Sequence, residues 1–77
     1  MKNKIEKFRF KLSWYEKIKD IDANSRGEIL RKIMEYMFED KIPKNFDSLV
    51  TKKMWNELFL ELKKEKKYQE SRLKYER

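Results

Sequence analysis

The sequence contains neither histidine nor cysteine among its 77 residues. These two residue types supply the commonest general base, the thiol nucleophile and most zinc ligands, so their absence excludes most catalytic and zinc-binding chemistry. A Gly-rich phosphate loop is also missing, and a core of this size cannot enclose a cleft of enzyme dimensions. We therefore expect no enzyme activity, no metal site, no cofactor and no small-molecule substrate.

Long hydrophobic runs are missing too. No apolar stretch approaches the roughly 18 residues that a membrane-spanning helix needs, and no signal peptide can be distinguished. We expect a cytoplasmic protein without a membrane partner. The apolar content of 39% suits one modest core, so residues 1–77 are predicted to form a single helical domain.

Glycine and proline occur once each, and both precede residue 48. Residues 48–77 are therefore predicted to form one long helix, with its regular part over 48–75. Its first half has an apolar face at helical spacing, made by Val50, Met54, Trp55, Leu58, Phe59 and Leu62. The second half keeps helix-forming residues but few apolar ones, so we expect it to project from the core with its acidic residues on solvated faces. Self-association through this helix is an open alternative, although no continuous heptad follows Leu62.

A central helix is predicted over residues 22–39. Its apolar stripe consists of Ile29, Leu30, Ile33, Met34, Met37 and Phe38. Asp22 and Ser25 are alternative N-caps, and Ser25 with Glu28 has the spacing of a capping box. Gly27 lies in the first turns, where glycine weakens a helix, and we expect it to allow close packing against the preceding helix.

The connection over residues 40–47 is marked by Pro43, which cannot donate a backbone hydrogen bond. We expect Ile42 and Phe46 to pack beneath the helices. Asp47 and Ser48 are alternative N-caps for the long helix.

The first residues alternate between charged and apolar side chains from Lys7 to Leu12, a pattern typical of an extended segment. Since a lone strand is unstable, we expect an extended N-terminal arm that crosses the helices, or that pairs with the same segment of another copy. Phe8 and Phe10 are its predicted core anchors.

A short first helix is predicted over residues 13–21. Ser13 and Glu16 have capping-box spacing at its start. Trp14 and Ile18 lie on one helical face, whereas Tyr15 lies off it. The predicted fold is therefore all-α, a three-helix module with an extended N-terminal arm and a long projecting C-terminal helix.

Positive charge is concentrated at the two ends of the sequence. The formal net charge is +7, and residues 21–51 contribute none of the excess, with five Lys or Arg residues against six acidic ones. Basic side chains interleaved with aromatic ones suit nucleic acid, because cations release counterions from phosphates and rings stack on bases. The alternative is that the lysines only keep the protein soluble. The candidate binding residues lie on the arm and the long helix: Lys7, Arg9, Lys11, Lys52, Lys53, Lys63, Lys64, Lys66, Lys67, Tyr68, Arg72, Lys74 and Tyr75.

Several short motifs, in this order, resemble a short domain common in phages and prophages of Gram-positive and related bacteria. They are Phe8-x-Phe10, Ser13-Trp14-Tyr15-Glu16, Gly27-Glu28-Ile29-Leu30 with Ile33 and Tyr36, Lys41-Ile42-Pro43, and Lys67-Tyr68-Gln69-Glu70. That domain typically stands at the N-terminus of longer proteins often linked with phage replication, which continue into a basic, Gly-rich linker where this chain stops at Arg77. The resemblance implies a helical module in the bacterial host cell and provides no active site.

Two functions are compatible with this resemblance. The first is an accessory phage or prophage protein that binds nucleic acid, or a replication-type protein that processes it, through the basic helical surface. The second is a small inhibitor of a host defence nuclease, because the size and charge also resemble those of anti-CRISPR proteins. Both are binding functions without chemistry of their own.

Overall fold

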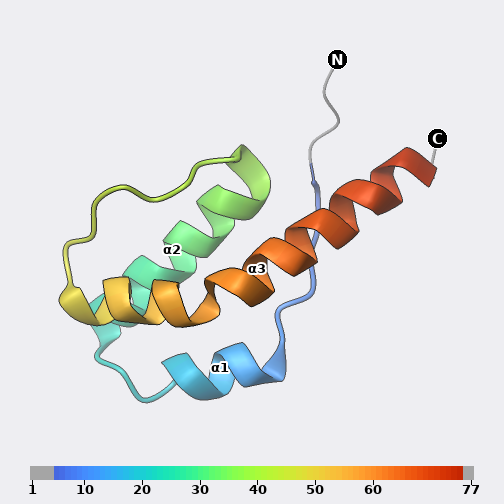
Figure 1. Cartoon of the computed structure of the whole chain (residues 1–77). Coiled ribbons are helices and arrows are strands. Elements are labelled where there is room, and N and C mark those ends of the chain that lie inside the picture. Colours follow the sequence, from blue (N-terminus) through green and yellow to red (C-terminus); the bar gives the residue numbers. More distant parts are fainter. Residues whose placement is uncertain (1–4, 76–77) are drawn as a thin grey trace.

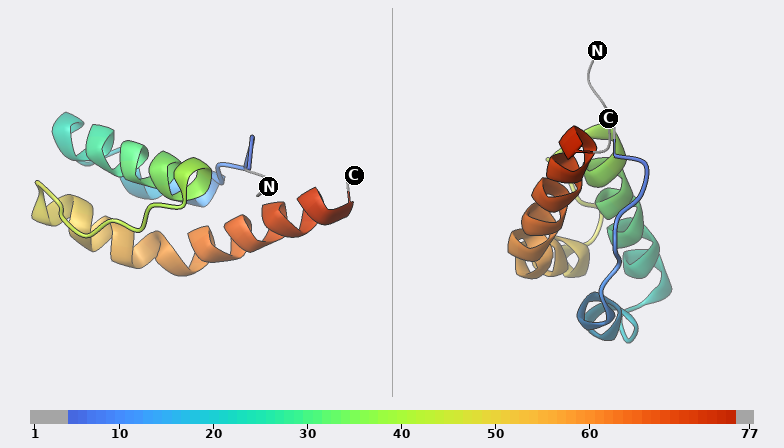
Figure 2. Two further views of the ribbon diagram at one scale, coloured as in Figure 1. Left: turned by 90° about the horizontal axis from the view of Figure 1, so that it is seen from above. Right: turned by 90° about the vertical axis from the view of Figure 1, so that its right-hand side faces the viewer.

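The structure is a computed structural model that describes residues 5–75, with side chains to residue 73. Figure 1 shows three helices and no strand in this part of the chain, namely α1 (Leu12–Ile18), α2 (Ala23–Glu39) and α3 (Leu49–Tyr75). The predicted all-α fold of three helices is confirmed. α3 extends well past the end of α2 (Figure 2). The radius of gyration of 13.1 Å accordingly exceeds the roughly 11 to 12 Å expected of a compact chain of this length.

α1 starts without the predicted capping box. Its N-cap is Lys11, in an extended backbone conformation, and no side chain caps it. The amide of Tyr15 bonds directly to the carbonyl of Lys11, at 3.2 Å. The prediction for Ser13 and Glu16 is therefore wrong, and the helix ends three residues before the predicted limit. Trp14 and Ile18 are buried as predicted.

Asp22, one of the two predicted N-caps, caps α2. The Asp22 carboxylate accepts a hydrogen bond from the Ser25 amide, at 3.0 Å. The C-cap of α2 is Asp40, whose φ of 57° is left-handed, and the Lys41 amide bonds back to the Glu35 carbonyl. The expected close packing at Gly27 is wrong, since a Cβ built there would meet nothing within 4 Å.

The starts of α2 and α3 are joined by side-chain hydrogen bonds. The Ser48 hydroxyl caps α3 by accepting from the Val50 amide at 3.1 Å, and it also lies 2.7 Å from the Ser25 hydroxyl. The Glu28 carboxylate accepts from the Asp47 amide at 2.6 Å. Ser25 and Glu28 therefore connect two helices and do not form the capping box that their spacing suggests.

The core lies between α2 and α3 and is closed by α1. Its centre is aromatic, because the Tyr36 and Trp55 rings meet edge-on with centroids 5.5 Å apart. The other buried core residues are Trp14, Ile18, Ile29, Ile33, Met37, Met54, Leu58 and Leu62. Every apolar residue predicted on α3 except Val50 is buried or packed against this core.

Four expected core residues are instead exposed, namely Phe10, Met34, Ile42 and Val50. The face of α2 that meets α3 is centred on Ile29, Ile33 and Tyr36, so Met34 lies one step around the helix from it. Val50 lies in the first turn of α3, on its exposed side. Phe10 packs edge-on against Trp14 from outside, with centroids 5.4 Å apart.

The N-terminal arm, residues 5–11, crosses the second half of α3 (Figure 1). Ile5 is buried, and the Phe8 ring lies 5.3 Å from that of Phe38 on α2. The arm therefore covers one face of the C-terminal part of α3, and the opposite face of the helix stays open.

Candidate nucleic-acid interface

The arm is tied to α3 by Arg9 and Glu65. The Arg9 backbone amide donates to one carboxylate oxygen of Glu65 at 2.9 Å. Its guanidinium donates to the other oxygen at 3.1 Å from Nε and 2.9 Å from Nη2. Gln69 completes the site by donating to the carboxylate at 2.7 Å. Arg9 is thus engaged within the fold, although it was predicted as a ligand-binding residue.

Glu65 is fully buried, contrary to the expectation that the acidic residues of this helix face solvent. Burial by itself would raise the pKa of its carboxyl group. The hydrogen bonds from Arg9 and Gln69 outweigh burial and hold the pKa below its ordinary value. Glu65 is therefore an ionised internal anchor for the arm.

Lys66 forms a second internal ion pair. Its ammonium group donates to Asp40, at the end of α2, and to Glu70 at 3.3 Å. It also lies 5.3 Å from the centroid of the Tyr36 ring. Burial would lower the pKa of this amine, but the hydrogen bonds to the two carboxylates outweigh it and raise the pKa. Lys66 therefore joins α2 to α3, in addition to any role in binding.

The other lysines of α3 up to residue 73 are exposed, and most of them share one face. At about 100° per residue, six exposed positions between residues 53 and 67 fall within an arc of about 100° that contains no acidic residue. We call this face the α3 ridge; it consists of Lys53, Asn56, Leu60, Lys63, Lys64 and Lys67. Lys52 is exposed beside it. No salt bridge joins these lysines to another described residue.

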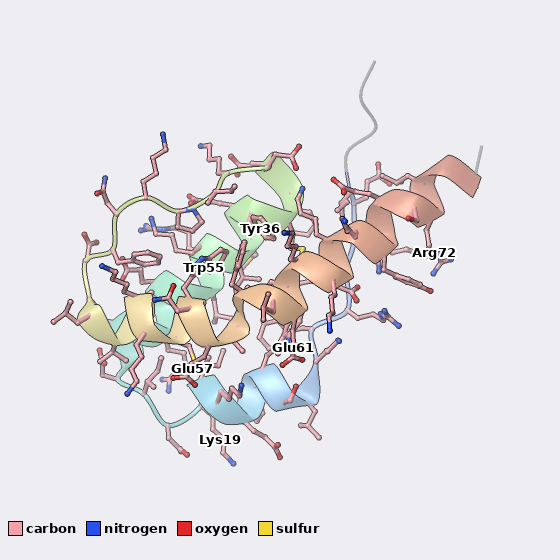
Figure 3. All side chains as sticks on the ribbon, viewed as in Figure 1. Lys19, Tyr36, Trp55, Glu57, Glu61 and Arg72 are labelled. Atoms are coloured by element: carbon pink, nitrogen blue, oxygen red, sulfur yellow. The ribbon has the colours of Figure 1, made fainter. Side chains whose placement is uncertain are left out.

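The acidic residues of the same helical segment lie elsewhere. Figure 3 shows Glu57 and Glu61 on the side of α3 that faces α1. There the Glu61 carboxylate accepts a hydrogen bond of 3.4 Å from the indole of Trp14. The separation of charges around the helix leaves the α3 ridge with lysines and without an acidic residue.

Tyr68 lies between the ridge and the arm. The Arg9 guanidinium is 4.3 Å from its ring centroid, and that of Arg72 is 6.0 Å away. Arg72 extends from the last part of α3 (Figure 3) and makes further contacts within the fold. The side chains of Lys74 and Tyr75, also predicted to bind, lie outside the described part of the structure.

The two lysines of the arm are not on the ridge. Lys7 is exposed and lines a small hollow of about 50 Å³ with Gln69 and Arg72. Lys11 is half-buried, with its ammonium group 5.8 Å from the Trp14 ring. The predicted residues whose side chains are described therefore form two groups, one on or beside the α3 ridge and one around the arm, with Lys66 buried between α2 and α3.

Residues 5–75 contain no group of three or more acidic side chains arranged to hold a metal ion. In the same part of the chain, none of the helices has both the length and the apolarity needed to cross a bilayer.

The fold and the surface together define a small all-α module with a group of exposed lysines on one face of α3. The chain belongs to a family of unknown function, DUF6291, which matches residues 7–77. The match therefore includes both partners of the bond between the arm and α3, Arg9 and Glu65. Comparisons with curated proteins and with solved structures give no match.

Proposed function

We propose that this chain is a non-enzymatic module that binds nucleic acid through the α3 ridge. The observation that carries the proposal is the group of Lys63, Lys64 and Lys67, which are exposed within little more than one turn and pair with no described acidic residue. The nearby acids Glu65 and Glu70 are already occupied by Arg9 and Lys66.

The chemistry is exchange of counterions. Each lysine that contacts a phosphate releases condensed cations, so the logarithm of the affinity falls with the logarithm of the salt concentration by about 0.9 per phosphate contact. Four contacts give a loss of about 100-fold between roughly 50 and 200 mM salt. An affinity that depends so steeply on salt is the signature we expect.

Fluorescence anisotropy with labelled oligonucleotides at these two salt concentrations tests the proposal. The triple variant Lys63→Ala, Lys64→Ala, Lys67→Ala should fold normally and lose binding. Its matched control removes three exposed lysines elsewhere, through Lys17→Ala, Lys19→Ala and Lys44→Ala, and has the same net charge. Equal loss of binding by both variants, or no binding by wild type at low salt, would refute the proposal.

The wider setting is proposed on the resemblance of the sequence motifs alone. In this proposal the module is a phage or prophage accessory protein that acts in the cytoplasm of the bacterial host, on nucleic acid or on a replication-type protein. Self-association through α3 stays a prediction, which the molar mass in solution tests.

A second candidate function is direct binding to a protein, as an inhibitor of a host defence nuclease would require. It is favoured by the apolar side chains exposed where the arm meets α1, since Leu12 is 69% and Tyr15 54% exposed. In this case the double variant Leu12→Ala, Tyr15→Ala restores nuclease-based immunity that co-expression of the wild type suppresses. If wild type leaves immunity intact, this candidate fails.

A further inference from the structure

The middle of the α3 ridge has two uncharged residues between two groups of lysines. Asn56 is exposed, and Leu60 is 70% exposed although it is a large apolar side chain. Neither contributes to the core. An apolar and an amide side chain, one turn apart and surrounded by lysines, form a surface that the fold itself does not use.

The spacing of the lysine groups is fixed by the helix. Lys53, with Lys52 beside it, precedes the group of Lys63, Lys64 and Lys67 by 10 to 14 residues. At 1.5 Å per residue this is about 15 to 21 Å along one rigid element. The major groove of B-form DNA is about 12 Å wide. Lysine side chains at the two ends of the α3 ridge can therefore reach phosphates on both sides of one groove.

Single-stranded nucleic acid would need something different, namely open aromatic rings beside the cations. Among the described aromatic residues of α3, only Tyr68 is exposed, and the Arg9 guanidinium already stacks on it at 4.3 Å. Both tryptophans are buried in the core. The described part of the α3 ridge thus offers phosphate contacts without a stacking platform.

We propose that the partner is duplex DNA and that the α3 ridge lies in its major groove. This inference rests on the proposed function and names its substrate class. The lysines at both ends bind the phosphates of the two strands. Asn56 and Leu60 face the base edges between them. A-form RNA is excluded as the preferred partner, because its major groove is too narrow for a helix to enter.

The two central residues predict a preference for base pairs. An asparagine amide pairs with N6 and N7 of adenine, and an apolar side chain contacts the methyl group of thymine. Asn56 and Leu60 therefore favour A·T pairs. A bidentate contact of this kind discriminates at least about fivefold against the wrong base.

The test measures binding of the full chain to four labelled probes: an A·T-rich and a G·C-rich DNA duplex of about 20 base pairs, single-stranded DNA, and an RNA duplex. We expect binding to duplex DNA at least about tenfold tighter than to the other two classes, and tighter to the A·T-rich duplex. The variants Asn56→Ala and Leu60→Ala should fold normally, because both side chains are exposed. They should abolish the A·T preference and leave binding to the G·C-rich duplex within about twofold.

Each other outcome has a distinct meaning. Preference for single-stranded DNA or for RNA overturns the duplex assignment and leaves the proposed nucleic-acid binding in place. An A·T preference that is absent, or unchanged in both variants, overturns the placement of Asn56 and Leu60 in the groove. If the wild type binds none of the probes at low salt, the proposed function fails as well. Circular dichroism of each variant confirms that its fold is intact.

Discussion

The Glu65 carboxylate binds both the backbone amide and the guanidinium of Arg9, a residue 56 positions earlier in the sequence. The bond fixes the arm in place because it holds main chain and side chain at once. Glu65 is buried, whereas the Arg9 side chain is 62% exposed. The two partners therefore contribute unequally to stability.

Substitution of Arg9 should lower the free energy of unfolding more than substitution of an ordinary exposed charged residue. Arg9→Ala leaves the buried Glu65 carboxylate without its guanidinium partner, although the backbone amide of residue 9 and Gln69 still donate to it. Loss of a hydrogen bond to a buried ionised group destabilises a protein more than loss of one to a neutral group. We expect a clear decrease in the free energy of unfolding, since a core of this size supplies only roughly 3 to 5 kcal/mol. Urea unfolding measures the change, with Lys7→Ala, an exposed lysine on the same arm, as the control. Equal effects of the two substitutions would contradict the proposed anchoring role.

The stability contributed by Glu65 should disappear in acid. Its folded-state pKa lies below the ordinary value of 4.5. The contribution is therefore complete above about pH 4.5 and is lost as the pH falls through the folded pKa. Glu65→Gln lacks this contribution at every pH, so the difference in unfolding free energy between wild type and variant should shrink on acidification. Urea unfolding at several pH values between 7 and 3 measures it. A difference that stays constant over this range would contradict the prediction.

The junction between α2 and α3 gives a further prediction. Ser48→Ala removes the N-cap of α3 and the contact with the Ser25 hydroxyl. N-cap losses cost about 0.5 to 2 kcal/mol, and we expect a value near the upper end because the contact to Ser25 is lost as well. Thermal unfolding tests it. Ser71→Ala on the exposed part of α3 is the control and should be nearly neutral.

The helices could be predicted from the sequence because their signals are local. Apolar spacing placed the helices, and Asp22 and Ser48 were among the predicted caps. The two S-x-x-E patterns were misleading, since neither forms a capping box. The side chains of Ser25 and Glu28 form hydrogen bonds with residues at the start of α3. These partners lie about 20 positions further along the chain, so the local pattern could not predict them.

The candidate site was predictable only in part, for the same reason. Helical spacing places Lys63, Lys64 and Lys67 together on one face. The internal role of Lys66 depends on Asp40, 26 residues away, and that of Glu65 on a residue of the arm. The burial of Glu65 could have been predicted from its spacing. Glu65 follows Leu58 by seven residues and Leu62 by three, so it continues their buried stripe.

Two adjacent lysines, Lys66 and Lys67, should respond differently to the same substitution. Lys66 is buried against Asp40 and Glu70, whereas Lys67 is exposed on the α3 ridge. Lys67→Met should lower the slope of log affinity against log salt by about 0.9, the loss of one phosphate contact. Lys66→Met has the same net charge but removes a lysine whose charge is already balanced. It should therefore change the slope much less. Anisotropy titrations of both variants on one DNA duplex make the comparison. If both slopes fell equally, binding would follow the total charge of the chain, and the face on which a lysine lies would not matter.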